Sequence, residues 1–381
     1  MDRTEILRWL HRKLAAPATG TKRRIVRFRR HGDYKRFLNV WTEWAASSAK
    51  RERVRHLPLI QGFSFPDEGG AASSSCFPAK DVWLEVDQPV AVDAPNIMPK
   101  PTTADRGIPW GVQKIKAPLA WSSTTGHRIK VGVIDTGVDF NHPDLKQSLG
   151  RGINLLNRSA LPFDDNGHGT HIAGTIAAAN QVHGMIGVAP RATVYPVKAF
   201  DNNGSAFVSD IVLGIEWCVN NGMNVINMSF GMKSRSKSLL SAVNHAYNSG
   251  VIIVASSGND GKRKAVDYPA RYPQTIAVGA TTRLRRVAPF SNRGMHIDIY
   301  APGDKILSAW LRGKYNEMSG TSMATSHVSG AIALLLAQHP GLSPGDIKAI
   351  LKKSMVPLRG TKVPRVTGEL DIMRMLQAAE R

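Results

Sequence analysis

Short apolar runs alternate with helical patterns from about residue 108 to the C-terminus. Five runs are rich in Val and Ile and are bounded by turn residues: 129–135, 193–200, 224–229, 251–256 and 275–280. Helical spacing of apolar residues marks four further segments: 168–179, 208–220, 238–248 and 322–338. Continuous apolar strands are typical of parallel sheets covered on both faces, so the pattern predicts a doubly wound, mostly parallel α/β fold. In such a fold the active site lies at the carboxyl ends of the strands.

A different pattern precedes residue 100 and predicts a small α+β domain. Residues 24–29 alternate apolar and basic side chains, as a half-buried strand does, and residues 33–48 have the spacing of an amphipathic helix. Two more strands are predicted over residues 55–65 and 81–89. The Gly/Ser-rich stretch between them, 69–78, disfavours a helix.

Prolines and a scarcity of apolar residues in 93–108 predict an exposed connection between the two domains. We place the division near residue 102. The expected organisation has four parts: an N-terminal extension (1–20), an α+β domain (21–94), a linker (95–107) and an α/β domain (108–381).

Composition excludes several classes of protein. The chain has 381 residues, of which 42% are hydrophobic and 21% charged, and this balance excludes disorder or a coiled coil as a description of the whole. The longest strictly apolar run, 331–337, is far shorter than the roughly 18 residues that a membrane span needs. Two cysteines exclude a disulfide scaffold. The first thirty residues lack the pattern of a secretory signal, which favours a cytoplasmic protein, with extracellular release by another route as the alternative.

The charge of the chain raises the question of a nucleic-acid partner. A formal net charge of +21 arises from 50 Lys and Arg against 29 Asp and Glu, with basic runs at 22–30 and 262–264. These runs lack the interleaved aromatic residues that stack on bases. A third of the excess positive charge lies before residue 101. We therefore expect no nucleic-acid partner.

Three motifs place a carboxylate, an imidazole and a hydroxyl at predicted strand ends and helix starts. Asp135 ends a strand in Val-Ile-Asp-Thr-Gly, His168 opens a helix in Asn-Gly-His-Gly-Thr-His, and Ser322 opens a helix in Ser-Gly-Thr-Ser-Met-Ala. Serine becomes a nucleophile when an imidazole takes its proton, and a carboxylate orients that imidazole. Singly, these residues fit a turn aspartate, a core histidine and a capping serine; together they predict a catalytic triad.

The three motifs, in the order Asp, His, Ser, resemble those of the subtilisin-like serine endopeptidases from about residue 108 to the C-terminus. The resemblance implies hydrolysis of peptide bonds in proteins through an acyl-enzyme. It also implies that Asn259 and the backbone N–H of Ser322 stabilise the oxyanion; the alternative for Asn259 is a turn residue. Ser326 replaces a proline usual in the family. We expect His171 and His327 to pack within helices.

The resemblance further implies a cleft that binds an extended peptide. One wall of its primary specificity pocket would consist of Ser229, Phe230 and Gly231, and the other of Ser256, Ser257 and Gly258. Asp267 would lie at the pocket floor and attract Lys or Arg before the scissile bond, helped by Asp260 at the rim. The alternative pairs Asp267 with Arg271 or Lys264.

A structural calcium ion is a further implication of the resemblance. Asp144 matches a calcium carboxylate of the family. The loop 179–185 would add oxygen ligands from Ala179, Gln181, His183 and Met185, a set that suits calcium. The alternative is a capping aspartate beside an ordinary loop.

Residues 21–94 resemble the family's propeptide, most clearly over 82–90. The resemblance implies a monomeric precursor whose propeptide occupies its own cleft until a cut within 93–108 releases it. Residues 1–20 lie outside the resemblance. Their apolar stripe, Ile6, Leu7, Leu10 and Leu14, is expected to cover the protein itself rather than a membrane surface.

Overall fold

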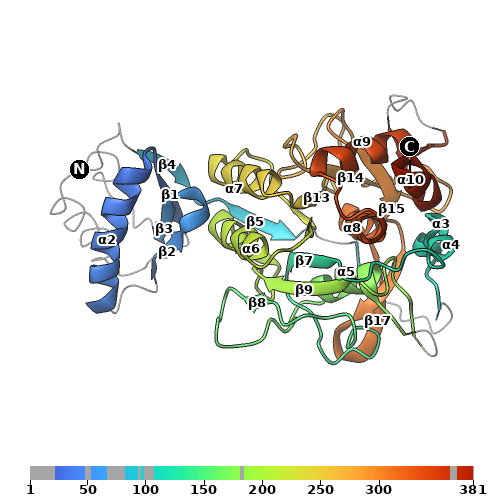
Figure 1. Cartoon of the computed structure of the whole chain (residues 1–381), viewed down its shortest axis with the longest axis horizontal. Helices are drawn as coiled ribbons and strands as arrows, with labels where there is room; N and C mark the ends of the chain where they lie inside the picture. The colour runs from blue at the N-terminus through green and yellow to red at the C-terminus, as the bar shows by residue number, and fades with distance from the viewer. Residues whose placement is uncertain are drawn as a thin grey trace.

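The computed structural model describes residues 22–47, 53–66, 82–92, 96–97, 107–180, 184–360 and 367–380. The extension 1–20, the stretch 69–78 and residue 102, where we placed the division, lie outside these ranges. Figure 1 shows a small N-terminal part at one end of the long axis and a larger α/β part at the other. None of the described helices is both long and apolar enough to cross a bilayer.

A nine-stranded sheet forms the centre of the α/β part, and the predicted doubly wound architecture is confirmed. Its strand order is β18-β19-β15-β14-β13-β11-β7-β9-β8, with all neighbours parallel except β18 and β19. The strands are β7 (Lys130–Asp135), β8 (Ile153–Asn154), β9 (Thr193–Lys198), β11 (Val225–Met228), β13 (Ile252–Ser256), β14 (Ile276–Thr281), β15 (Ile299–Pro302), β18 (Val356–Pro357) and β19 (Gly368–Glu369). The four strands absent from the prediction have at most four residues each, too few for a periodic signal.

Helices cover both faces of this sheet. Successive strand residues alternate between two cores: Val225 and Val254 belong to one, and Ile226 and Ile253 to the other. The first core includes α5 (His168–Ala177) and α8 (Thr321–Gln338), and the second includes α6 (Val208–Asn220) and α7 (Lys237–Asn248). Burial on both faces explains the continuous apolar runs in the sequence. The remaining helices of this part are α3 (Trp110–Lys114), α4 (Ala117–Ala120), α9 (Pro344–Ser354) and α10 (Ile372–Ala379).

The N-terminal part has a four-stranded antiparallel sheet of order β2-β3-β1-β4 with one helix on it. Its elements are β1 (Arg23–Phe28), α2 (His31–Ser47), β2 (Arg55–Leu57), β3 (Gly62–Pro66) and β4 (Val82–Val86). The single strand predicted over 55–65 is wrong. A 3-10 turn at Pro58–Ile60 and a left-handed Gln61 (φ 52°) reverse the chain there and form a hairpin.

The strand predicted over 81–89 divides in the same way. β4 ends at Val86, and a separate strand, β5 (Pro89–Val92), follows and leaves the N-terminal sheet. In Figure 1, β5 extends from the N-terminal part toward the centre of the α/β part. The sequence pattern missed this break because both strands have the same extended periodicity.

Candidate active site

Asp135 and His168 form a buried pair at the carboxyl edge of the sheet. Asp135 is the last residue of β7, and His168 is the first residue of α5. Nδ1 of His168 lies 2.8 Å from Oδ1 and 3.0 Å from Oδ2 of Asp135, and both residues are buried. A carboxylate in this position orients the imidazole and presents its other nitrogen, Nε2, away from the aspartate.

Ser322 is the second residue of α8, which packs against α5. It is fully buried, and its hydroxyl donates a hydrogen bond of 3.1 Å to the carbonyl oxygen of Ser229. Ser229 lies between β11 and β12 (Phe230–Gly231). The predicted nucleophile and the first residue of the predicted pocket wall are thus in contact.

Asn259 lies against the start of the helix that carries Ser322. Its Oδ1 accepts hydrogen bonds from the backbone N–H and the hydroxyl of Thr321, each 2.9 Å long. Its Nδ2 is buried and makes no hydrogen bond to any residue that the structure describes. A fixed amide with an unused buried donor is typical of a site that stabilises negative charge developing on a ligand.

The cleft beside these residues contains a strand of the chain itself. β5 pairs antiparallel with β10 (Ser205–Phe207) on one side and with β12 on the other. In this register Ala91 lies opposite Gly231, and Val92 lies opposite Phe230. The three-stranded arrangement is the one expected when an extended peptide adds to a binding cleft.

A second short strand also pairs with a segment close to Ser322. β6 (Asn96–Ile97) pairs antiparallel with β17 (Lys314–Ser319), which ends three residues before Ser322. β5 pairs with the residues next to Ser229, whose carbonyl contacts the Ser322 hydroxyl. Residues 92 and 96 therefore both pair with segments next to the candidate nucleophile.

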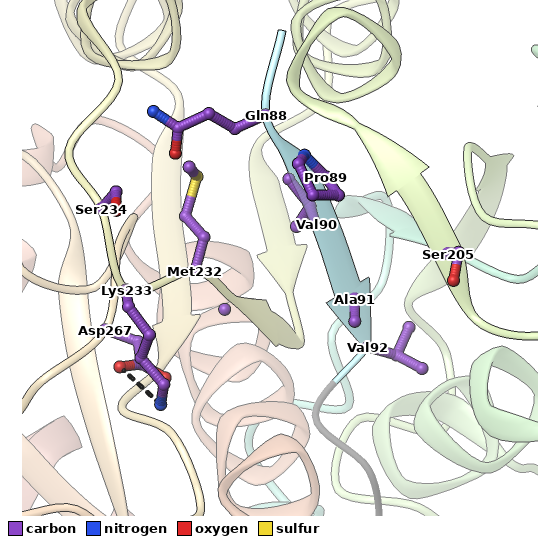
Figure 2. A pocket seen from close by; sticks show the side chains of 11 residues that line it. Gln88, Pro89, Val90, Ala91, Val92, Ser205, Met232, Lys233, Ser234 and Asp267 are labelled. Carbon is purple, nitrogen blue, oxygen red and sulfur yellow. Dashed lines mark hydrogen bonds and ion pairs between the residues drawn. The ribbon is translucent and has the colours of Figure 1, made fainter. Parts of the chain in front are cut away.

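A cavity of about 710 Å³ lies between β5 and the segment after β12. Figure 2 shows Lys233 and Asp267 paired on one side of it and β5 on the other. Asp267 is buried, its backbone N–H bonds to the carbonyl of Ser257, and its carboxylate pairs with Lys233 at 2.8 Å. Lys233 also pairs with Asp260. Neither predicted partner, Arg271 or Lys264, makes this contact, and the sequence analysis missed Lys233.

Charge pairing and burial shift the pKa values of Asp260 and Asp267 in opposite directions. Burial raises the pKa of Asp267, although the hydrogen bond from Lys233 opposes the rise. The same lysine lowers the pKa of Asp260, which is less buried. Asp267 therefore depends more strongly than Asp260 on a cation beside it.

Two carboxylates of the N-terminal part cap helices of the α/β part. Glu85 accepts hydrogen bonds from the backbone N–H groups of Lys237 and Ser238, in the first turn of α7, and from the hydroxyl of Ser236. Asp87 accepts one from the backbone N–H of Ser209 in the first turn of α6. Helix N-termini attract anions, so these contacts hold the two parts together. The pattern of residues 82–90 gives no sign of this capping role.

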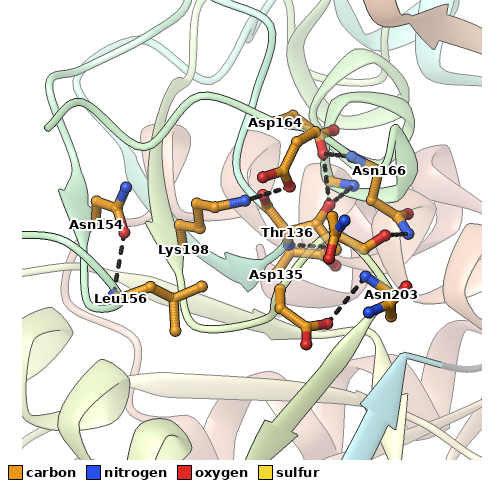
Figure 3. Close-up of polar contacts among 12 residues, drawn as sticks. Asp135, Thr136, Asn154, Leu156, Asp164, Asn166, Lys198 and Asn203 are labelled. Atoms are coloured by element: carbon orange, nitrogen blue, oxygen red, sulfur yellow. Dashed lines mark hydrogen bonds and ion pairs between the residues drawn. The ribbon is translucent and has the colours of Figure 1, made fainter.

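A hydrogen-bonded network anchors the loop before His168 to the end of β7 (Figure 3). The Asp164 carboxylate accepts five hydrogen bonds, from the hydroxyl groups of Thr136 and Thr170 and from the backbone N–H groups of Asn166, Gly167 and Thr170. Its contact with Thr136, the neighbour of Asp135, joins the strand that carries the aspartate to the helix that carries the histidine. The sequence analysis missed Asp164.

His171 and His327 are both fully buried, as expected of packing residues. Nε2 of His171 lies 3.0 Å from the carbonyl of Ile306, and Nδ1 of His327 lies 2.7 Å from that of Met323. Burial lowers the pKa of His171 to about 3 and that of His327 to about 4. Both imidazoles are therefore neutral near pH 7.

Asp144 does not fit a calcium ion as it is placed. Its carboxylate already accepts hydrogen bonds from Asn180 (2.7 Å), the backbone N–H of Met185 (2.9 Å) and the hydroxyl of Tyr315 (2.7 Å). The described residues contain no cluster of three or more His, Cys, Asp or Glu that would hold a metal. The predicted ligands Gln181 and His183 lie outside the described residues. Calcium binding is typical of subtilisin relatives, but the contacts at Asp144 favour a hydrogen-bonded anchor of the loop over the calcium site that the resemblance implies.

A buried Asp–His pair at the edge of a parallel sheet, next to a helix with serine in its first turn, defines a class: the α/β serine hydrolases. A family model described as the subtilase family matches residues 126–369. The chain is 43% identical to subtilisin E of Bacillus subtilis (strain 168) over 254 residues, which cover 65% of this chain and 66% of the relative. The chain therefore belongs to the subtilase family, and the resemblance inferred from the motifs is confirmed; the chain spans just under two thirds of the length of this relative.

Two further relatives support this assignment. A subtilisin of Bacillus pumilus is 43% identical over 254 residues, 92% of its length. An alkaline protease of Alkalihalobacillus alcalophilus is 44% identical over 263 residues, which cover 69% of this chain and 68% of the relative.

The expected cytoplasmic location is wrong. Subtilisin relatives are secreted extracellular enzymes, and this favours the alternative, an enzyme that acts outside the cell. The expectation depended on a missing signal pattern in the first thirty residues, and such an absence does not exclude export.

Proposed function

We propose that the chain is the precursor of a serine endopeptidase in which Ser322 attacks the carbonyl carbon of a peptide bond. His168 takes the hydroxyl proton on Nε2 and later delivers it to the leaving amine, and Asp135 stabilises the imidazolium. The proposal is supported by the 2.8 Å contact between Asp135 and Nδ1 of His168, which leaves Nε2 as the proton acceptor. Before attack, the Ser322 hydroxyl turns from the carbonyl oxygen of Ser229 toward Nε2 of His168.

Asn259 is proposed to stabilise the oxyanion of the tetrahedral intermediate, together with the backbone N–H of Ser322. The observation behind this role is the buried Nδ2, which has no partner among the described residues while Oδ1 is held by Thr321. A preorganised donor of this kind costs no reorganisation when charge develops on the carbonyl oxygen.

Substrates are proposed to be extended segments of proteins that replace β5 between β10 and β12. Ser229, Phe230 and Gly231 form one wall of the pocket, and Ser256, Ser257 and Gly258 form the other; Ser256 and Phe230 are bridged by a hydrogen bond of 3.4 Å. Main-chain pairing of this type binds many sequences, and side-chain pockets then select among them.

The N-terminal part is proposed to act as an intramolecular inhibitor that the enzyme removes from itself, and the mature enzyme is proposed to be a monomer. β5 fills the cleft, and two carboxylates anchor the part to α6 and α7. β5 ends at Val92 and β6 begins at Asn96, and both strands pair with segments next to Ser322, so the maturation cut is expected between these residues. Asp144 is proposed to anchor its loop through its three donors rather than to bind calcium.

Labelling with a fluorophosphonate probe tests the nucleophile. The processed protein should be labelled at Ser322, and the Ser322→Ala variant should be neither labelled nor active. Ser326→Ala is the matched control, because Ser326 lies on the same helix and donates its hydroxyl proton to the carbonyl of Met323. Absence of labelling in the processed protein would refute the proposal.

The same variants test self-processing. The wild type should yield a fragment that begins between residues 93 and 97, whereas purified Ser322→Ala should remain full length. N-terminal sequencing locates the cut. A Ser322→Ala chain that matures while purified alone would show that another protease makes it.

A further inference from the structure

An exposed lysine covers a buried carboxylate in the candidate pocket. Nζ of Lys233 lies 2.8 Å and 3.1 Å from the two carboxylate oxygens of Asp267, and it also pairs with Asp260. The side chain of Lys233 is 62% exposed, whereas that of Asp267 is 6% exposed. The cation can therefore leave for solvent, but the carboxylate cannot.

The buried carboxylate lies close to the reacting centre. A Cβ added at Gly258 would overlap the Asp267 carboxylate, so that carboxylate lies directly behind this wall of the cleft. Gly258 precedes Asn259, whose side chain contacts the residue before Ser322. The substrate residue whose carbonyl lies between Ser322 and Asn259 therefore places its side chain next to the wall that contains Gly258.

The local charges favour one more cation. Two carboxylates, Asp260 and Asp267, share the single ammonium of Lys233, which leaves one unit of negative charge in direct contact. Lys262 also acts on both aspartates, but it is exposed, and solvent screens its influence. Asn292 bonds to Asp260 and adds no charge.

We propose that Lys233 is an internal competitor for the pocket, which occupies the position of a Lys or Arg side chain of the substrate. This inference rests on the proposed peptidase function and assigns its substrate class: proteins cut after a basic residue. When such a residue enters, its cation replaces Lys233 at Asp267, and Lys233 moves into solvent. When an apolar residue enters, Lys233 stays and neutralises the carboxylate.

Exposure and burial give this exchange its physical basis. An ion pair made by an exposed lysine contributes little stability, so its displacement costs little. A buried carboxylate without a partner is costly, so Asp267 needs one cation or the other. Lys233 therefore reduces the discrimination between basic and apolar residues that the two aspartates would otherwise impose.

The test compares kcat/KM for two peptides that differ only in Arg or Leu before the cleaved bond. Lys233→Met should raise the Arg-to-Leu ratio by about tenfold, since its removal frees two carboxylates. Asp267→Asn should lower the ratio below that of the wild type. Lys262→Met removes the same charge without the direct contact and should change the ratio less than about twofold.

Fluorophosphonate titration of each processed variant keeps the two proposals distinguishable. Normal titration with an unchanged or lower ratio in Lys233→Met would overturn the role of Lys233 and leave the peptidase intact. No titration in any variant would refute the peptidase itself. Should Asp267→Asn fail to fold, the Arg-to-Leu ratios of the two exposed variants, Lys233→Met and Lys262→Met, still test the role of Lys233.

Discussion

The N-terminal part and the α/β part of this subtilase are built on different cores. Between α2 and the four-stranded sheet, eleven buried residues form the core, and seven of them are aromatic: Phe28, Tyr34, Phe37, Trp41, Trp44, Phe63 and Phe65. The cores of the α/β part consist mainly of Val, Ile, Leu and Ala on both faces of the nine-stranded sheet. A small domain with one helix buries enough apolar area only by using its largest side chains.

The second face of the small sheet has no core of its own. Ile25, Leu57 and Ile60 are buried in the same cluster as residues of α6 and α7. Both helices also contact the 3-10 turn at Pro58–Ile60. The N-terminal part therefore completes its burial only while it covers the α/β part, and its release exposes apolar surface.

The largest expected effect concerns the chemistry of the α/β part alone. Asn259→Ala should lower kcat by about 10²–10³-fold, or roughly 2.7–4 kcal/mol, which is the loss known for the matching amide of subtilisin. KM should change little, because the lost donor acts only on the transition state. Steady-state kinetics of the processed enzyme measure it. Asn248→Ala, an exposed change at the end of α7, should leave kcat unaltered. A wild-type kcat in Asn259→Ala would remove the residue from the mechanism.

The second prediction concerns a variant in which the contact between the two parts is weaker. Glu85→Gln, in a full-length Ser322→Ala chain, removes a charge-assisted cap on α7 worth about 1.5–3 kcal/mol. Amide exchange in β5 should then accelerate by roughly 10–100-fold, as measured by mass spectrometry. Asn39→Ala, exposed on α2, is the control. Unchanged exchange in β5 would mean that strand pairing alone holds the part in place.

The third prediction concerns how the stability of the α/β part depends on pH. His171 and His327 have pKa values near 3 and 4 when folded, below the ordinary 6.5, so the unfolded α/β part binds protons that the folded one does not. The unfolding free energy should be fully present above pH 6.5. Below it, stability should fall by about 1.4 kcal/mol per histidine and pH unit, until the folded pKa is reached.

Denaturant unfolding of the Ser322→Ala chain at pH 7 and pH 5 measures this loss. His327→Gln should make the dependence shallower, whereas His296→Gln, an exposed change, should not. Equal stability at both pH values would contradict the neutral, buried state of the two histidines.

The smallest expected effect is that of a chelator. Because three donors already hold the Asp144 carboxylate, an excess of chelator should leave the melting temperature unchanged. Asp144→Asn should lower it with or without chelator. A chelator-dependent fall in the wild type, reversed by added calcium, would show that calcium binds and stabilises by mass action.

Sequence patterns succeeded where structure follows from neighbouring residues. The five central strands and α6 followed from local periodicity, and Asp135, His168 and Ser322 stand at the strand end and helix starts where their motifs predicted them. The single strand over 55–65 failed because the reversal at Gln61 leaves the alternation of side chains almost intact.

Only the tertiary structure decided which distant charges meet. Lys233 lies 34 residues from Asp267, Asp87 lies 122 residues from Ser209, and Glu85 lies more than 150 residues from the start of α7. No periodicity records such pairs, since each depends on how two elements pack after the chain has folded. The sequence by itself determined the five central strands, the family and the positions of Asp135, His168 and Ser322 at a strand end and helix starts, because local periodicity and motifs encode these features. The strand in the cleft and the cation in the pocket depended on the fold, because long-range contacts place them there.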